Sequence, residues 1–131
     1  MPRSVLPFLM FQGDAEAALE FYRATIPGAE VDRVERYGEG EQVPAGRFKS
    51  ARLTLAGQEV MVLDSPPVHD FTFTPSFSFH VECADEDEVR TLAEALAQDG
   101  ATMMPVGNYG FSRLFAWVSD RFGVSWQLNC A

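Results

Sequence analysis

The sequence contains one pattern of residues twice, and this repeat constrains the fold more than any other feature. Tyr37-Gly38 recurs as Tyr109-Gly110, and Gly28-Ala29 recurs as Gly100-Ala101, in both cases 72 positions later. After the Tyr-Gly pairs the offset between matching residues is smaller, first about 62 and then 66. The first half has a longer loop after its Tyr-Gly pair, which explains the change. A chain of 131 residues that repeats in this way is expected to consist of two copies of one module.

Each half has the hydrophobic periodicity of one strand, one helix and three further strands. We expect Asp14 and Asp85 to cap the two helices, because each precedes apolar residues at helical spacing. Gly28 and Gly100 are expected to end these helices. The predicted strands are residues 5–11, 29–37, 47–55 and 58–64 in the first half, and 76–83, 101–105, 112–118 and 124–129 in the second.

Short turns and a proline-rich segment connect these elements. Ala56-Gly57 and residues 120–123 have the composition of hairpin turns, and Ser65-Pro66-Pro67 begins a linker. The predicted fold class is α+β, with two βαβββ modules that form a cupped mixed sheet in a single domain of residues 1–131. The first module covers about residues 5–65, the linker about 65–75 and the second module about 76–131.

The composition excludes several classes of partner. Ten Lys and Arg residues against nineteen Asp and Glu give a net charge of −9, so a nucleic acid or an anionic membrane would meet a repulsive field. No apolar run reaches the ~18 residues of a membrane span, and no signal peptide is recognisable, so we expect a cytoplasmic protein. Nine arginines against the single Lys49 are typical of a GC-rich bacterial genome.

Cys83 and Cys130 fall on apolar strand faces and are interpreted as inert buried thiols.

Seven segments of the chain carry a family resemblance that runs from about residue 5 to the end. They are residues 7–11, 15–22, 35–38, 55–58, 69–75, 109–112 and, most specifically, 120–129. In these segments the chain resembles the PhnB-like group of the vicinal oxygen chelate superfamily, to which glyoxalases and bleomycin-resistance proteins belong. The resemblance implies paired βαβββ modules and a homodimer. It implies no single activity, because the superfamily includes lyases, dioxygenases, epimerases and drug-sequestering proteins.

The resemblance also implies where a divalent metal ion would bind in this chain. Metal-dependent members of the superfamily place His and Glu side chains on strands that face a cup between the sheets. The corresponding positions here fall near Leu6 or Pro7, on Ser50, on Ser78 (or His80 after a shift of two residues) and on Gln127. One imidazole and one amide are too few to hold such an ion. We therefore expect no metal and no other cofactor.

Strand alternation groups polar side chains on the faces that turn away from the helices. A small-molecule pocket needs a few convergent polar groups and apolar walls, which this face can supply. Arg52 and Arg113 favour a carboxylate or phosphonate ligand, but a salt bridge of Arg52 or Arg113 to Glu82 or Glu59 is an equal alternative. The candidate ligand-binding residues are Ser50, Arg52, Met61, Ser78, Arg113, Phe115, Trp117 and Gln127.

Three residues are candidates for acid–base chemistry. His80 and Glu82 lie two positions apart on one strand face, where the carboxylate would raise the pKa of the imidazole, and Tyr109 follows in the second module. A lone histidine on a strand is more often structural, and the His-Glu pair could equally be solvated or lie in a dimer interface. The Phe71-Thr72-Phe73 loop is a candidate pocket lid or dimer contact.

These observations predict a metal-free homodimer that binds a small molecule. The alternatives are an enzyme that acts on a small polar or anionic substrate through His80, Glu82 and Tyr109, and a structural dimer without a ligand. The motifs of dinucleotide-binding, P-loop and serine-hydrolase proteins are absent. PhnB-like proteins are also labelled 3-demethylubiquinone methyltransferase-like, but no glycine-rich loop follows the first strand to hold a methyl-donor nucleoside.

Overall fold

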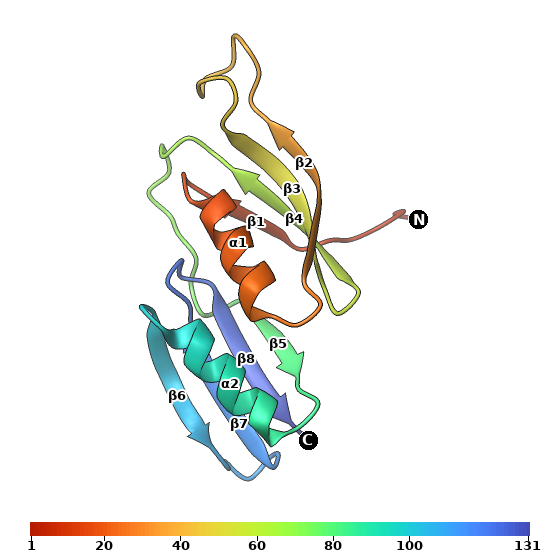
Figure 1. Ribbon diagram of the computed structural model, residues 1–131, viewed down its shortest axis with the longest axis vertical. Coiled ribbons are helices and arrows are strands. Elements are labelled where there is room, and N and C mark those ends of the chain that lie inside the picture. The colour runs from red at the N-terminus through yellow and green to blue at the C-terminus, as the bar shows by residue number, and fades with distance from the viewer. The chain divides into compact units, whose positions relative to one another are not determined.

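The two halves of the sequence fold as two units with the same order of elements (Figure 1). The computed structural model describes residues 1–131, and the units are Met1–Asp70 (unit 1) and Phe71–Ala131 (unit 2). Unit 1 contains β1 (Phe8–Phe11), α1 (Ala15–Thr25), β2 (Glu30–Arg36), β3 (Phe48–Leu55) and β4 (Gln58–Asp64). Unit 2 contains β5 (Ser78–Glu82), α2 (Glu86–Ala97), β6 (Ala101–Gly107), β7 (Leu114–Ser119) and β8 (Ser125–Cys130).

Each unit forms one mixed sheet of four strands. The strand order is β1-β4-β3-β2 in unit 1 and β5-β8-β7-β6 in unit 2, so the same topology occurs twice. The first strand of each unit runs parallel to the last, and all other pairs are antiparallel. The predicted α+β class with two βαβββ modules is confirmed.

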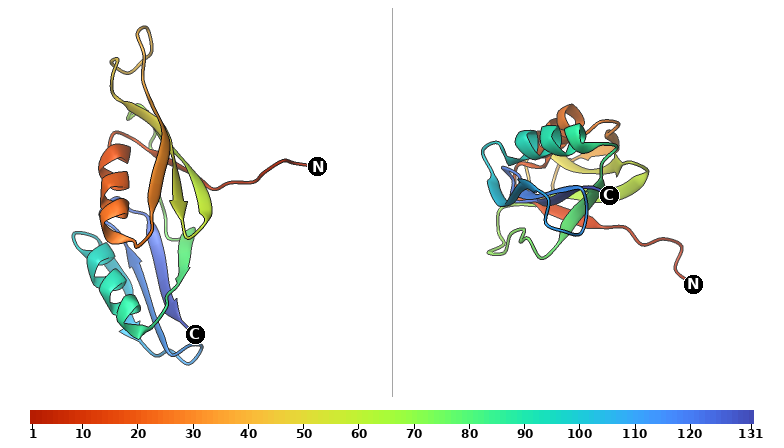
Figure 2. Two further views of the ribbon diagram at one scale, coloured as in Figure 1. Left: turned by 45° about the vertical axis from the view of Figure 1, so that its right-hand side comes forward. Right: turned by 90° about the horizontal axis from the view of Figure 1, so that it is seen from below.

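One helix covers one face of each sheet and leaves the opposite face without a helix (Figure 2). In unit 1, Tyr22 of α1 is fully buried in the same core as Leu53 and Val60 of the sheet. In unit 2, the buried stripe of α2 includes Leu96, and the sheet contributes the fully buried Trp126. We call the helix-free side of each sheet its open face.

The two helices begin in different ways, and one predicted cap is wrong. Asp85 caps α2 as expected, because its side chain accepts a hydrogen bond of 2.8 Å from the Glu88 amide. Asp14 occupies the same position before α1, but its side chain accepts no capping bond. Asp64, at the end of β4, accepts hydrogen bonds from the amides of Gly13 (2.6 Å) and Ala15 (3.4 Å) instead. A residue distant in sequence therefore accepts the hydrogen bonds of amide groups at the N-terminus of α1.

The glycines after the helices also differ in their roles. Gly28 has a φ of 77°, as expected of a glycine that follows a helix. After α2 it is Asp99 that adopts the left-handed conformation, with a φ of 61°. Gly100 is needed for another reason, because a Cβ atom there would lie 2.1 Å from the Ser119 carbonyl oxygen. The predicted role of Gly100 as a stop signal is thus corrected to that of a close-approach position.

The predicted hairpin at Ala56-Gly57 is confirmed. These residues join β3 to β4 with φ angles of 48° and 86°, which is typical of a tight two-residue turn. Neither α1 nor α2 has the length and hydropathy of a membrane-spanning helix.

Candidate functional site

The open face of unit 2 carries a polar row along two parallel strands. In the register of β5 and β8, Ser78 lies beside Ser125, His80 beside Gln127, and Glu82 beside Asn129. From the neighbouring strand β7, Trp117 pairs with Gln127 and Phe115 pairs with Asn129. The structure therefore places the predicted residues Ser78, His80, Glu82, Phe115, Trp117 and Gln127 on one sheet face.

Glu82 is held by the end of the chain rather than by His80. Its carboxylate accepts hydrogen bonds from Asn129 Nδ2 (2.8 Å) and from the Ala131 amide (2.9 Å). The Asn129 side chain, followed by the Ala131 amide, lowers the pKa of the Glu82 carboxyl, and the charge of His80 adds a smaller effect in the same direction. Glu82 thus acts as a fixed anion with its two oxygens engaged. Asn129 Oδ1 is buried without a hydrogen-bond partner.

Hydroxyl and indole groups on the same face bind one another. Ser78 Oγ lies 2.6 Å from Ser125 Oγ, and Trp117 Nε1 donates a hydrogen bond of 2.8 Å to Ser125 Oγ. These contacts join β5, β8 and β7 through side chains. The Ser78 hydroxyl is consequently part of a structural network, in a position where the resemblance implied a metal ligand.

Tyr109 and Arg113 also have partners within unit 2. The Tyr109 hydroxyl donates a hydrogen bond of 2.5 Å to the Pro105 carbonyl oxygen, and its ring packs against Phe111 and Phe115. Arg113 donates from Nε to the Ala131 carbonyl oxygen (2.8 Å) and from Nη2 to Cys130 Sγ (3.1 Å). Neither anticipated carboxylate, Glu82 or Glu59, is the partner of Arg113.

The open face of unit 1 brings the other three predicted binding residues into one hollow. Ser50, Arg52 and Met61 line a cavity of about 370 Å³, which is within the size range of small-molecule pockets. We call it the β3–β4 hollow. The other residues that line it are Phe8, Arg33, Glu35, Ala51, Val62 and Leu63. The sequence analysis did not name Phe8, Arg33 and Glu35 as candidates. Phe8 pairs with Met61 and Glu35 pairs with Ser50, so the pairing of these strands would have indicated both residues.

The polar contacts in the β3–β4 hollow are long. Arg52 Nη1 lies 3.5 Å from Glu59 Oε2, so the salt-bridge alternative for Arg52 is realised with Glu59. Ser50 Oγ donates to Glu35 Oε2, also at 3.5 Å. The Arg52 side chain is 22% exposed and that of Glu59 is 42% exposed, so the pair stays accessible to solvent. Contacts of this length in partly exposed pairs are weak, which leaves both groups available to a ligand.

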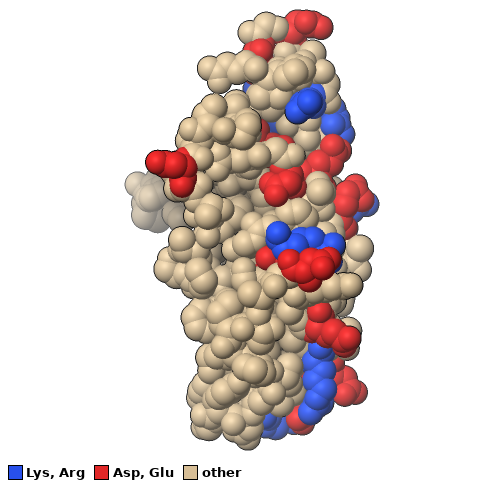
Figure 3. Space-filling view, turned by 90° about the vertical axis from the view of Figure 1, so that its left-hand side faces the viewer, with Lys and Arg blue, Asp and Glu red and all other residues tan.

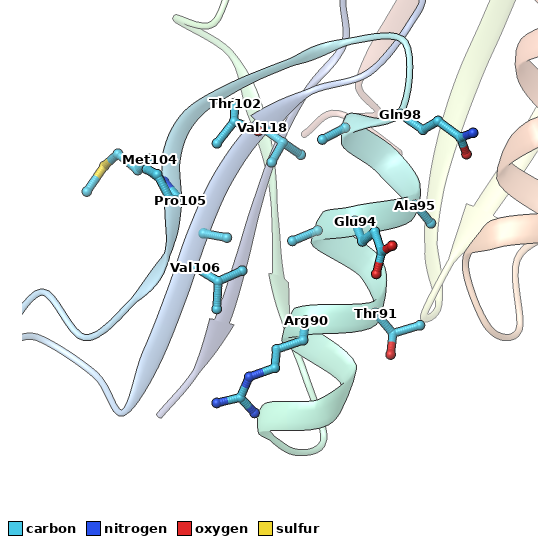
Figure 4. Close-up of a pocket in the computed structure, with 13 residues that line it drawn as sticks. Arg90, Thr91, Glu94, Ala95, Gln98, Thr102, Met104, Pro105, Val106 and Val118 are labelled. Atoms are coloured by element: carbon cyan, nitrogen blue, oxygen red, sulfur yellow. The ribbon is translucent and has the colours of Figure 1, made fainter.

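Two further hollows lie away from every predicted residue. One, of about 930 Å³, lies between α2 and β6 on the helix side of unit 2, with a floor that includes Ala116 and Val118 (Figure 4). We call it the α2–β6 groove. The other, of about 560 Å³, lies at the N-terminus of α1 and is lined by Arg36, Tyr37 and Asp64 among others. Burial raises the pKa of the Asp64 carboxyl, although the Gly13 and Ala15 amides oppose this effect.

The cysteines and the charged surface offer no reactive cluster. Cys83 and Cys130 are buried, and burial raises the pKa of the Cys83 thiol to about 11, so it stays protonated at neutral pH. No three His, Cys, Asp or Glu side chains converge as a metal ion would require. On the face shown in Figure 3, acidic and basic side chains lie beside one another rather than in separate patches.

Comparisons with known proteins agree with this architecture. A family model described as 3-demethylubiquinone-9 3-methyltransferase matches residues 3–129. The chain is 27% identical to protein YjdN of Escherichia coli K12, over 98% of this chain and 95% of YjdN. The solved structure of the PhnB protein from Bacillus cereus is 45% identical, with a TM-score of 0.90 over 98% of this chain and 100% of that chain.

A more distant solved structure shows the wider fold. The glyoxylase/bleomycin resistance protein/dioxygenase domain from Frankia sp. EAN1pec is 14% identical, with a TM-score of 0.67 over 100% of this chain and 98% of that chain. From the family match and the Bacillus cereus relative we conclude that the chain belongs to the 3-demethylubiquinone-9 3-methyltransferase family, in its PhnB-like group, and that it shares the fold of the glyoxylase/bleomycin resistance protein/dioxygenase domain.

Proposed function

We propose that this protein binds a small molecule in the β3–β4 hollow without a metal ion. The observation that carries the proposal is that Ser50, Arg52 and Met61, three of the candidate ligand-binding residues named from the sequence, line one hollow of suitable size. The hollow combines guanidinium and hydroxyl groups with the exposed apolar surface of Phe8 and Met61. Such a mixture is typical of pockets that orient a ligand through a few polar contacts.

The donor groups present support binding without a metal. The positions that correspond to metal ligands fall near Leu6 or Pro7, on Ser50, on Ser78 (or His80 after a shift of two residues) and on Gln127, so at most one imidazole is among them. The Ser78 hydroxyl is bound to Ser125, and the Ser50 hydroxyl contacts Glu35. Neutral hydroxyl and amide groups are poor ligands for zinc and similar ions. These residues do not fit a catalytic divalent ion.

The enzymatic alternative remains a prediction that no contact favours. It requires His80, Glu82 and Tyr109 to exchange protons with a substrate. Both oxygens of Glu82 accept hydrogen bonds within unit 2, and the Tyr109 hydroxyl donates to Pro105. The methyltransferase activity in the family description is likewise not proposed for this chain, because no glycine-rich loop is available to hold a methyl donor.

A set of four aryl fragments tests binding and locates it. Benzoate, phenylphosphonate, benzamide and benzylamine share a ring and differ in charge, and we expect at least one to raise the melting temperature. A fragment at ten times its Kd adds about 1.4 kcal/mol to the free energy of unfolding, which is a rise of several degrees. Met61→Trp fills the β3–β4 hollow and should abolish the rise. Val106→Trp, which fills the α2–β6 groove at a similarly exposed position, should preserve it.

The opposite pattern would reject the proposed location. If Val106→Trp abolished the rise and Met61→Trp did not, the ligand would bind beside α2. If no fragment changed the melting temperature of the wild-type protein, the binding function itself would be rejected.

We also propose that the protein acts as a homodimer. Large apolar side chains remain exposed in unit 2, with Phe71 at 57%, Phe77 at 51% and Phe111 at 63%. Exposed aromatic groups of this kind are expected to be covered by a partner. Light scattering at micromolar concentration should therefore give about twice the chain mass of 14.5 kDa. A mass of one chain would contradict the dimer and leave the ligand proposal untouched.

A further inference from the structure

Strand β2 contains a bulge beside the β3–β4 hollow, and Arg33 lies in it. Between the pairs Asp32–Arg52 and Glu35–Ser50, β2 advances by three residues while β3 advances by two. Arg33 has a φ of 52°, which is the left-handed conformation. This conformation is unfavourable for most residues except glycine, asparagine and aspartate. A bulge of this kind redirects a side chain, and here Arg33 forms part of the wall of the hollow.

The charges that line the hollow are unequal. Arg33 and Arg52 contribute two positive charges, and Glu35 contributes one negative charge. No residue of the chain forms a hydrogen bond or ion pair with the Arg33 side chain. Arg52 has only the 3.5 Å contact with Glu59. The residues that line the hollow therefore carry one excess positive charge in a chain whose net charge is −9, and the Glu59 carboxylate lies beside Arg52 outside this lining.

We propose that Arg33 and Arg52 bind the anionic group of a small acid, a carboxylate or a phosphonate, in the β3–β4 hollow. This inference rests on the proposed function and names the class of ligand that the hollow takes. The guanidinium group presents a planar fork of N–H donors that matches the oxygens of both anions. The apolar part of the acid would contact Phe8 and Met61, whose exposed fractions are 51% and 37%.

Backbone strain at a binding residue agrees with this role. An unfavourable φ at a residue whose side chain forms no hydrogen bond or ion pair contributes nothing evident to the fold, and such strain is concentrated at functional positions. Glycine adopts a φ of 52° freely, so Arg33→Gly should fold at least as well as the wild type while it removes the guanidinium group. This variant separates the loss of a ligand contact from the loss of folding.

Glu35 carries a charge opposite to that of the two arginines, so removing this charge should strengthen the binding of an acid rather than weaken it. Its carboxylate lines the hollow and would repel an acid bound there. Glu35→Gln removes that charge, and the glutamine oxygen can still accept the hydrogen bond from Ser50 Oγ. The variant should therefore bind the acid more tightly than the wild type.

Calorimetric titration of the full chain with phenylphosphonate tests these roles. We expect Arg33→Gly and Arg52→Gln each to lower the affinity about tenfold, and Glu35→Gln to raise it about threefold. Arg47→Gln and Glu39→Gln are the matched controls, because neither residue lines this hollow, and both should leave the affinity within twofold. Benzamide should bind at least tenfold more weakly than phenylphosphonate. A tighter Kd for phenylphosphonate than for benzoate would identify the phosphonate as the preferred anion, and the reverse order would identify the carboxylate.

Two results would overturn the inference. One is binding of benzamide or benzylamine with an affinity equal to that of phenylphosphonate. The other is an affinity for phenylphosphonate that stays within twofold in both arginine variants. In either case a fragment still binds, so the small-molecule function stands and only the anionic class is wrong. Failure of all four fragments to bind would instead reject the proposed function on which the inference rests.

Discussion

Replacing Asp120 with alanine should lower the free energy of unfolding by about 4 kcal/mol. Asp120 is 3% exposed and lies in the turn between β7 and β8. Its Oδ1 accepts hydrogen bonds from the amides of Phe122 (2.9 Å) and Val124 (3.0 Å), and its Oδ2 accepts one from Trp126 Nε1 (2.9 Å). Alanine would leave the buried donors of Val124 and Trp126 without an acceptor, and each such donor costs about 1–3 kcal/mol.

Chemical denaturation monitored by tryptophan fluorescence measures this loss. Asp70→Ala is the matched control, because Asp70 is exposed, and it should change the free energy of unfolding by less than about 0.5 kcal/mol. Asp120→Asn keeps one acceptor oxygen but places an NH₂ group beside N–H donors that need an acceptor. We therefore expect the free energy of unfolding of this variant to lie between those of the wild type and Asp120→Ala. A loss below about 1 kcal/mol for Asp120→Ala would show that the turn does not depend on this carboxylate.

Gly100→Ala should destabilise the protein by about 3 kcal/mol. A Cβ atom at this position would lie 2.1 Å from the Ser119 carbonyl oxygen and 2.8 Å from the Asp120 carbonyl carbon. Both neighbours are backbone atoms, so no side chain can rotate away to make room. The segment after α2 would have to move from the end of β7, and this would disturb the pairing of Ala101 with Ser119 at the start of β6.

Gly107→Ala is the matched control at the other end of β6. A Cβ atom there would meet only ordinary contacts, the nearest at 3.6 Å from the Tyr109 ring, and its backbone does not require glycine. We expect a change of less than about 1 kcal/mol in the free energy of unfolding. If thermal unfolding gave equal melting temperatures for the two variants, the close approach of Gly100 to β7 would be disproved.

The architecture was predictable because its signals are local and occur twice. Strand alternation and helical spacing depend on neighbouring residues, so the order βαβββ and the polar faces of β3, β5 and β8 follow from the sequence. The Asp85 cap was also predictable, because its partner Glu88 lies three residues away. Duplication strengthened each of these assignments, since a pattern found in one half could be checked in the other.

Long-range contacts were not predictable in the same way. Asp64 caps α1 from 49 residues further along the chain, and no local pattern links the two. The Arg33 bulge depends on the register between β2 and β3, which alternation alone does not give. The α2–β6 groove exists because α2 and the edge strand β6 lie some distance apart. This distance depends on how the helix packs on the sheet, which sequence periodicity does not give. The partners of Arg113 and Glu82 near Ala131 depend on how β8 ends.

Amide chemical-shift mapping by NMR tests the central claim of a ligand site on the open face of unit 1. The ¹⁵N-labelled full chain would be titrated with the fragment from the set of four that raises the melting temperature most. We expect the largest shift changes at the amides around the β3–β4 hollow, those of Arg33, Ser50, Arg52 and Met61. Shift changes concentrated instead on Glu94 and Val106, which line the α2–β6 groove, would contradict this claim.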